Sequence, residues 1–415
     1  MPELLTLGLF EAVGIEAEYM IVDRNGLDVL PVCERVLAAQ AGCITSEDES
    51  DDINWSNELV LHVIELKTAG PARDWERLPG AFQLHVERVN EQLAPLGGRL
   101  MPTAMHPWMD PYRETRLWPH EYNVVYETFD RIFDCRGHGW SNLQSLHVNV
   151  PFADDEEFGR LHAAVRLLLP ILPAIAASSP VVEGRVNGVL DNRLAAYRTN
   201  CARVPSITAR IIPEPVFTLA AYHESILQPV YRDLAPYDPQ RVLQHEWVNA
   251  RGAIGRFDRN TIEIRVLDVQ ECPAADLAIA AAVTAVLKLI VAQTWSDLAA
   301  QQAWATDPLA GLLEATIRDG DLTVIEDDAY LHALGWPGPS PCTAGQLWRH
   351  LIDEARSRLP AALAFCEDQL ETILRHGPLA RRILRALGPQ PSRSRLAAVY
   401  RLLCDCLAAG EMFLA

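Results

Sequence analysis

The sequence is poor in basic residues. Its 415 residues include 36 lysines and arginines against 55 aspartates and glutamates, which gives a formal net charge of −19 at pH 7. A nucleic-acid or anionic-membrane partner favours a basic surface, so this balance argues against both. Polar low-complexity runs are also absent, and 49% of the residues are hydrophobic. The chain therefore has enough apolar material for a large core, in one big domain or two smaller ones.

A cysteine framework is also absent. Of the nine cysteines, only Cys404 and Cys406 lie close together, and no pair has the spacing of a zinc knuckle or a redox CxxC motif. We therefore expect a reduced, cytoplasmic compartment. The first residues lack the basic start and long apolar run of a signal peptide. The most apolar later segments, 167–182 and 278–292, contain prolines or a lysine, so we expect buried helices without membrane contact.

Strand-like runs are confined to the first two thirds of the chain. β-branched and aromatic residues predict strands over residues 13–22, 58–68, 143–150 and 261–269. Apolar residues at helical spacing predict helices over 74–96, 160–177, 276–295, 346–376 and 393–409. We expect a catalytic domain over residues 1–290 and a helical C-terminal region over 291–415 that packs on the same domain.

Three of these strands each carry two polar or charged side chains that are two residues apart. Side chains at this spacing point to the same face of a strand. The pairs are Glu16 with Glu18 in "GIEAEY", His147 with Asn149 in "SLHVNV", and Glu263 with Arg265 in "TIEIRVLD". Each pair alone is compatible with a solvated face, a hydrogen-bonded histidine or an ordinary ion pair. Together they favour one shared site, because carboxylates, imidazole and guanidinium bind metal ions and phosphate.

The segment "NELVLHVIELKT" adds Glu58 and Glu65, but with an irregular register. The two glutamates are an odd number of residues apart, so a regular strand would place them on opposite faces. A bulge or a late strand start would bring both to the site. Without either, Glu65 is the better candidate.

The sequence contains no Walker A motif, no kinase-type glycine-rich loop and no Ser/His/Asp or Cys/His nucleophile signature. Several carboxylates and one histidine, without cysteine, suit Mg²⁺ or Mn²⁺ better than zinc. Two or more such ions would neutralise ATP for phosphoryl transfer. Arginines that could stabilise the transferring phosphoryl group follow nearby, at positions Arg251, Arg256, Arg259 and Arg265.

The ordered motifs "GIEAEY", "ELVLHVIELKT", "TAMHPWMDP", "SLHVNV" and "RFDRNTIEIRVLD" resemble the glutamate–cysteine ligase-like carboxylate–amine ligases, which have a glutamine synthetase-type fold. The resemblance spans about residues 10–290. It implies an α+β fold in which an antiparallel sheet forms a funnel flanked by helices, followed by a helical C-terminal region. It also implies ATP as co-substrate and two or three Mg²⁺ ions at the floor of the funnel.

The resemblance also assigns roles to individual residues. It implies that Glu263 and Arg265 are catalytic, that Arg193, Tyr197 and Arg198 of "DNRLAAYRTN" contact an amino-acid substrate, and that His106 shapes the pocket wall. The implied metal ligands are Glu16, Glu18, Glu58, Glu65, His147 and Glu263. The implied ATP contacts are Asn149, Arg251, Arg256 and Arg265. Asn149 stands where many relatives have a second histidine, so its role in metal binding is open.

The implied reaction is ATP-dependent amide formation through an acyl phosphate, with glutamate or a related acid as the activated carboxylate. The acceptor is open between cysteine, a peptide and another amine. Two alternatives remain at this point: a kinase of the same fold that phosphorylates an amine or guanidine, and a non-catalytic relative that binds nucleotide or metal. The helical C-terminal region is a candidate interface for a homo-oligomer.

Overall fold

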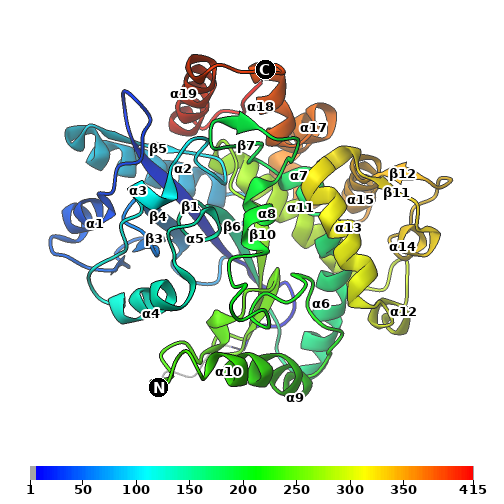
Figure 1. Ribbon diagram of the computed structural model, residues 1–415. Coiled ribbons are helices and arrows are strands. Elements are labelled where there is room, and N and C mark those ends of the chain that lie inside the picture. The colour runs from blue at the N-terminus through cyan, green and yellow to red at the C-terminus, as the bar shows by residue number, and fades with distance from the viewer. Residues whose placement is uncertain (1–5, 415) are drawn as a thin grey trace.

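The computed structural model describes residues 6–414, and its centre is an eight-stranded antiparallel sheet (Figure 1). Seven strands follow the order β2-β3-β4-β1-β6-β10-β9, and β5 pairs with the end of β1. The strands are β1 (Gly14–Asp23), β2 (Glu47–Asp48), β3 (Ile53–Asn57), β4 (Val63–Thr68), β5 (Gly98–Met101), β6 (Ser145–Pro151), β9 (Ala253–Arg256) and β10 (Thr261–Asp268). This architecture confirms the predicted antiparallel sheet.

Helices form most of the remaining chain. Up to residue 291 they are α1 (Cys33–Ala41), α2 (Leu78–Leu93), α3 (Pro111–Glu114), α4 (Asn123–Phe133), α5 (His138–Ser141), α6 (Asp155–Leu168), α7 (Pro173–Ala176), α8 (Asn192–Tyr197), α9 (Leu219–Tyr222), α10 (Gln228–Leu234) and α11 (Pro273–Val291). Beyond it they are α12 (Leu298–Gln302), α13 (Thr306–Asp319), α14 (Asp328–Ala333), α15 (Ala344–Arg358), α16 (Pro360–Leu363), α17 (Glu367–His376), α18 (Leu379–Leu387) and α19 (Arg393–Ala409). Two small two-stranded sheets pair β7 (Val181–Val182) with β8 (Arg185–Val186) and β11 (Val324–Ile325) with β12 (Cys342–Thr343).

The central strand β1 shows how the two faces of the sheet differ. Ile15, Tyr19 and Ile21 point to one face and are fully buried in the main hydrophobic core, which includes residues of α2, α6 and α11. Glu16 and Glu18 point to the other face, because side chains alternate along a strand. The core therefore fixes the register of β1, and that register presents the two glutamates together.

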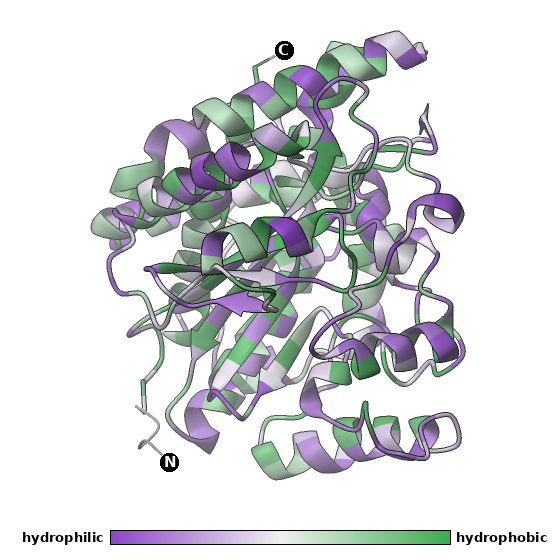
Figure 2. Cartoon of the chain, turned by 90° about the vertical axis from the view of Figure 1, so that its left-hand side faces the viewer, coloured by the Kyte–Doolittle hydropathy of each residue, from purple (hydrophilic) through white to green (hydrophobic). Residues whose placement is uncertain are grey.

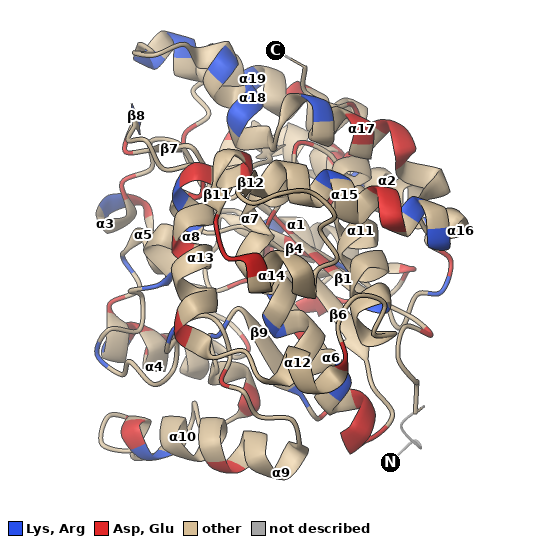
Figure 3. Cartoon of the chain, turned by 90° about the vertical axis from the view of Figure 1, so that its right-hand side faces the viewer, with Lys and Arg blue, Asp and Glu red and all other residues tan. Residues whose placement is uncertain are grey.

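Helix α11 lies against the apolar side of the sheet and is almost uncharged (Figure 3). It is the one helix among the described residues that is long and apolar enough to cross a membrane, but 89% of its apolar stretch is buried inside the protein. The sequence predicts a buried core helix here, and the structure agrees. The helix is apolar along its length because other elements of the protein contact it on all sides.

The C-terminal helices cover the far end of the same sheet. Met20 and Val22, which continue the polar face of β1, are fully buried in a second core with Leu379, Ile383 and Tyr400 of α18 and α19. Figure 2 shows hydrophobic and hydrophilic residues mixed along these helices, as expected when one side of a helix is buried. The polar face is thus open only over Glu16 and Glu18 and closed further along the strand.

Three predicted elements differ from the structure in more than their end residues. The helix predicted over 160–177 begins at Asp155 and is divided, because α6 ends at Leu168 and α7 covers only Pro173–Ala176. The strand predicted over 58–68 begins only at Val63, and the preceding strand β3 was missed, since its sequence "INWSN" carries polar residues on a buried strand. The helix predicted over 346–376 is interrupted between α15 and α16, because Pro360 disfavours a helical conformation at Leu359. The helix predicted over 393–409 is confirmed with the same bounds.

Candidate active site

The antiparallel register gathers the polar residues of four strands on one face. The cross-strand neighbours are Glu16 with His147 and Lys67, Glu18 with Glu65, and Asn149 with Glu263. Each pair is brought together by backbone hydrogen bonds between buried strands, so the arrangement is rigid. The sequence prediction that the polar pairs share one face is confirmed.

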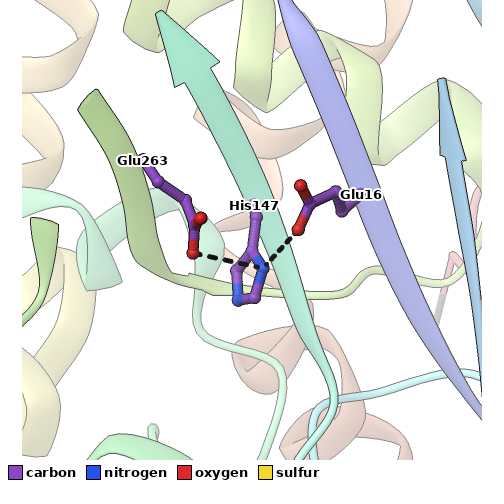
Figure 4. A group of neighbouring side chains, drawn as sticks. All are labelled: Glu16, His147 and Glu263. Carbon is purple, nitrogen blue, oxygen red and sulfur yellow. Dashed lines mark hydrogen bonds and ion pairs between the residues drawn. The ribbon is translucent and has the colours of Figure 1, made fainter. Parts of the chain in front are cut away.

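His147 lies between two carboxylates at the centre of this face (Figure 4). Its Nδ1 is 3.0 Å from Glu16 Oε2 and 3.9 Å from Glu263 Oε1. Its Nε2 is 2.9 Å from Ser145 Oγ, and that hydroxyl donates to Glu18 Oε2 at 2.9 Å. A carboxylate on one side of the ring and a hydroxyl that donates to Glu18 on the other favour the imidazolium form of His147. Burial lowers the pKa of His147, but the hydrogen bond to Glu16 and the charges of Glu18 and Glu263 outweigh burial and raise it.

Glu16 is held in its ionised form. Asn149 Nδ2 donates to Glu16 Oε1 at 3.1 Å, and the Arg259 guanidinium lies 3.8 Å from the same oxygen. Burial alone would raise the pKa of Glu16, but the hydrogen bond and charge of His147, with the charges of Arg259 and Lys67, lower it to about 2. Glu16 therefore presents a full negative charge at neutral pH.

A second set of carboxylates forms an acidic corner beside β4. Glu65 Oε2 accepts a hydrogen bond from Ser56 Oγ at 2.6 Å, and burial together with the charge of Glu16 raises the pKa of Glu65 to about 7. Glu58 lies before the start of β4, and burial and the charges of Glu18 and Glu65 raise its pKa well above its usual value. The late start of β4 thus places Glu58 beside Glu65, as the sequence analysis required. Lys67, whose Nζ lies 3.5 Å from Glu65 Oε2, is the cationic side chain at this corner, and its charge offsets only part of the effect of burial and of the neighbouring carboxylates.

The donor set fits divalent cations. Two groups of side chains each offer three ligand atoms within 4.8 Å of one another: Glu16, His147 and Glu263 form one, and Glu18, Glu65 and His147 form the other. Oxygen-rich sets of this kind, without thiolates, bind hard cations. His147 belongs to both groups, with Nδ1 facing Glu16 and Glu263 and Nε2 facing Glu18.

Two arginines fix Glu263 from the opposite side. Arg256 donates to Glu263 Oε2 at 2.9 Å, and Arg265 Nε lies 3.0 Å from Oε1. The side chain of Glu263 is only 3% exposed, whereas that of Arg265 is 25% exposed and faces a cavity. A buried carboxylate here orients two cationic groups, one of which remains accessible to an anionic ligand.

A cavity of about 270 Å³ opens beside the acidic corner. Its polar lining consists of Glu18, Glu58, Ser145, His147, Arg193, Tyr197, Asn200 and Arg265. Its apolar lining consists of Leu59, Tyr126, Phe129, Trp140, Leu143, Cys201, Trp247, Val248 and Ala250, with Gly139 between them. The cavity therefore joins candidate metal ligands, two arginines and a hydrophobic wall, which is the usual composition of a small-molecule site.

Arg193, a predicted substrate contact, is held firmly at this cavity. Its Nε donates to Asp268 Oδ1 at 2.5 Å, and its two terminal nitrogens donate to the carbonyl oxygen of Arg265 at 3.3 Å. Asp268 also accepts from the backbone nitrogen of Ser178 at 2.8 Å and from Ser179 Oγ at 2.9 Å. The guanidinium is thus fixed by a fully buried carboxylate.

The structure does not bring Arg251 and Arg198 to this cavity. Arg251 makes a bidentate pair with Glu214, at 2.6 Å for both contacts, and is 3% exposed. Arg198 lies on the surface and pairs with Glu314 at 2.6 Å. Arg198 precedes a turn at the end of α8, so its side chain leaves the face on which Arg193 and Tyr197 lie. Neither guanidinium lines the cavity.

His106 is likewise not part of the cavity wall. Its Nε2 donates to the carbonyl oxygen of Leu27 at 2.7 Å, and its Nδ1 accepts from the backbone nitrogen of Trp108 at 3.2 Å. Burial lowers its pKa to about 3, so the ring is neutral and structural. It fixes the loop that follows β5.

Several residues of the site were missed by sequence reasoning. Ser145 and Lys67 each lie two positions from a predicted residue on the same strand face, so strict alternation would have found them. Asp268 carried no such signal, because β10 has an irregular register between Ile264 and Leu267 that changes which residues share a face.

The sequence model described as Glutamate-cysteine ligase family 2 (GCS2) matches residues 12–401. The chain belongs to glutamate–cysteine ligase family 2. The match continues past residue 290 through the C-terminal helices, so the family is defined by the whole fold as well as by the motifs. Membership supports the predicted carboxylate–amine ligase class.

Proteins similar to this chain occur in archaea and bacteria. A protein of Archaeoglobus fulgidus named only as uncharacterized is 37% identical over 403 residues, covering 97% of this chain and 100% of its own. A Rubrobacter xylanophilus protein, named "Putative glutamate--cysteine ligase 2-3", is 28% identical over 275 residues, covering 65% of this chain and 67% of its own.

Two solved structures share the fold. A glutamate–cysteine ligase of Francisella tularensis, solved in complex with AMP, aligns with a TM-score of 0.60 at 12% identity, over 95% of this chain and 88% of its own. A bifunctional glutathione synthetase of Pasteurella multocida aligns with a TM-score of 0.55 at 14% identity, over 96% of this chain and 52% of its own. At these identities the likeness establishes the fold.

Proposed function

We propose that the protein is an ATP-dependent carboxylate–amine ligase that activates glutamate or a related acid as an acyl phosphate. The observation that carries this proposal is a single cavity lined by metal-binding carboxylates, by His147 and by the guanidinium groups of Arg193 and Arg265. A carboxylate and ATP repel each other, and such a site supplies the positive charge that brings them together. Family membership supports the same class of reaction.

The proposed role of each residue follows from its charge. We propose that Mg²⁺ or Mn²⁺ is held by the two ligand groups described above, with Glu58 beside them, and screens the phosphate oxygens of ATP. Arg265, oriented by Glu263, faces the cavity and is placed to stabilise the transferring phosphoryl group. Asn149 and Arg256 border Glu16 and Glu263, respectively, and are proposed contacts of ATP.

The proposed reaction has two steps. A carboxylate oxygen of the acid attacks the γ-phosphorus, and the bond between that phosphorus and the leaving oxygen of ADP breaks. The amine nitrogen then attacks the acyl carbon, phosphate leaves with the carbon–oxygen bond, and one proton is released. Arg193 is fixed by Asp268 in a position to hold a substrate carboxylate throughout, so orientation rather than a side-chain nucleophile provides the catalysis.

Mass spectrometry of products from ATP, Mg²⁺ and pooled acids and amines tests this proposal. A ligase yields ADP, phosphate and a condensed product in equal amounts. A phosphorylated amine or guanidine without a condensed product would instead identify a kinase. No ATP turnover with any pool would identify a non-catalytic relative.

The substitution Glu263→Gln removes one ligand charge while keeping the shape of the side chain. We expect turnover to fall by at least about a hundredfold, because both the cation and the guanidinium of Arg265 lose their buried carboxylate partner. Circular dichroism should show an unchanged fold. The matched control is Glu367→Gln, which removes a carboxylate that pairs with Arg356 in the C-terminal region, and it should keep full activity. Retained activity in Glu263→Gln would remove this residue from the metal site.

A further inference from the structure

Three aromatic rings form one wall of the cavity. We call Phe129, Trp140 and Trp247 the aromatic wall; they come from α4, α5 and the turn Glu246–Val248. The ring centroid of Phe129 lies 5.1 Å from that of Trp140 and 6.1 Å from that of Trp247. Each ring is only partly buried, so a face or edge of it remains available to a ligand.

The rest of the cavity lining is strongly polar. It includes the carboxylates of Glu18 and Glu58 and the guanidinium groups of Arg193 and Arg265. In the proposed reaction the acidic pair belongs to the metal site, Arg193 holds the carboxylate of the acid and Arg265 stabilises the phosphoryl group, which leaves the aromatic wall for the amine substrate. The cavity therefore offers three complementary surfaces: one for a cation, one for an anion and one for an apolar group.

We propose that the amine substrate is an α-amino acid with an aromatic or large aliphatic side chain, which packs on the aromatic wall. This inference rests on the proposed ligase function and names the substrate that the function leaves open. A dicarboxylic acid does not suit this position, because its second carboxylate would face Leu59, Phe129 and Trp247 without a partner. The side chain of cysteine or glycine is too small to cover the aromatic wall. Its binding would therefore bury less apolar surface than that of a large side chain.

The cavity is small, and its apolar lining extends beyond the three rings of the aromatic wall. Its volume of about 270 Å³ is slightly below the ~300–1,000 Å³ typical of drug-sized ligands. Neighbouring apolar residues complete the enclosure of a side chain, namely Leu59, Leu143, Val248 and Ala250.

A competition experiment tests the substrate class. The purified protein is given ATP, Mg²⁺, glutamate and an equimolar mixture of phenylalanine, tryptophan, leucine, cysteine, alanine and glycine. We expect products of the first three amino acids to exceed those of the last three by at least about tenfold, the range of discrimination that apolar contacts provide. Equal or greater use of cysteine or glycine would overturn the substrate class while leaving the ligase function in place.

Variants of the aromatic wall provide the second test. Trp247→Ala should lower kcat/KM for phenylalanine by at least about tenfold and change that for alanine by less than about twofold. Trp247→Phe should restore most of the activity, since an aromatic face is retained. The matched control is Trp336→Ala, which removes a partly buried tryptophan at the end of α14, away from the cavity lining. A uniform loss with both amino acids would overturn the proposed contact.

Isothermal titration calorimetry separates failure of this inference from failure of the ligase proposal. Phenylalanine should bind the wild-type protein more tightly than alanine, and Trp247→Ala should remove the difference. If no condensed product forms with any acid, the ligase function fails, but the calorimetric difference still supports the aromatic wall as an amino-acid site. If phenylalanine and alanine bind alike, the inference fails whatever the enzymatic result.

Discussion

Asp268 acts on the site through another residue. It is fully buried, and it accepts hydrogen bonds from Arg193, Ser178 and Ser179. Arg193 lines the cavity, and the position of its guanidinium depends on a carboxylate that does not itself line the cavity. Asp268 is therefore a positioning residue in the proposed reaction, and its contribution should be visible in substrate binding.

The substitution Asp268→Asn tests that role. We expect the KM of one substrate to rise about tenfold with a smaller change in kcat, because Arg193 loses its orientation but remains present. The free energy of unfolding should also fall, by about 3 kcal/mol, since a buried cation loses its partner. Asp319→Asn, which breaks a surface pair with Arg318, should cost at most about 1 kcal/mol and leave KM unchanged. Equal loss of kcat and an unchanged KM in Asp268→Asn would contradict the positioning role.

His162 illustrates a different kind of buried polar residue. Its ring is fully buried and stacked on Phe158, with centroids 5.3 Å apart and planes 19° apart. Burial and the charge of Arg166 lower its pKa to about 3, against ~6.5 in an unfolded chain. The unfolded state therefore binds one more proton between these values, so stability is full above about pH 6.5 and is lost as the pH falls toward 3.

Replacement by phenylalanine should remove this acid sensitivity. His162→Phe keeps the aromatic stack. We expect the fall in unfolding free energy from pH 8 to pH 5 to be smaller in this variant than in the wild type, by about 2 kcal/mol. Urea denaturation at the two pH values measures the difference. The exposed His332 offers a control, since His332→Phe changes no buried ring. Parallel shifts of His162→Phe at both pH values would rule out this explanation.

At the scale of single residues, strand alternation explains what could be predicted. Glu16, Glu18 and His147 were found because every second residue of a buried strand shares a face. Arg198 was misplaced because its neighbourhood in α8 depends on helix geometry and on a partner, Glu314, more than a hundred residues away. A contact between distant segments leaves no local pattern in a sequence.

At the scale of elements, burial and backbone chemistry decided where prediction succeeded. α11 and α19 were predicted well, because a long apolar or amphipathic run identifies a helix. β3 was missed because Asn54, Ser56 and Asn57 are buried yet polar. Ser56 donates a hydrogen bond to Glu65, so the site places a polar residue where a buried strand usually has an apolar one. The hydrophobic pattern that identifies a strand is therefore weak in this segment.

Close packing between α6 and the segment before α9 yields an element-scale prediction. Gly159 of α6 faces the backbone so closely that an added Cβ would lie 2.5 Å from the carbonyl oxygen of Phe217. We expect Gly159→Ala to lower the free energy of unfolding by about 1–3 kcal/mol, because a backbone atom cannot move aside cheaply. Urea denaturation measures the loss.

A second helical glycine provides the opposite expectation. Gly311 is exposed in the interior of α13, and an added Cβ there meets no atom within 4 Å. Gly311→Ala should therefore raise the free energy of unfolding by up to about 1 kcal/mol through helix propensity alone. If Gly159→Ala also raises the free energy of unfolding, helix propensity rather than packing controls position 159.

At the scale of the whole molecule, the C-terminal helices are part of the body that carries the site. The main hydrophobic core includes Val13 near one end of the chain and Leu407 near the other. The chain terminus is tied to the sheet as well, because Arg382 and the backbone of Phe413 both bind the buried carboxylate of Glu271. Glu271 lies three residues after Asp268. The carboxylate that binds Arg382, which we call the tether, and the carboxylate that positions Arg193 therefore belong to the same segment of the chain.

The predicted packing of residues 291–415 on the preceding region can be tested through that tether. Arg382→Met leaves the carboxylate of Glu271 buried without its cation, and we expect a loss of about 3–5 kcal/mol of unfolding free energy. Because one core spans both regions, circular dichroism and tryptophan fluorescence should report the same single transition, only shifted. Arg375→Met, which breaks an exposed pair with Glu371, should cost at most about 1 kcal/mol. Two separate transitions in Arg382→Met would instead show that the helical region unfolds by itself and that the boundary near residue 290 divides two independent domains.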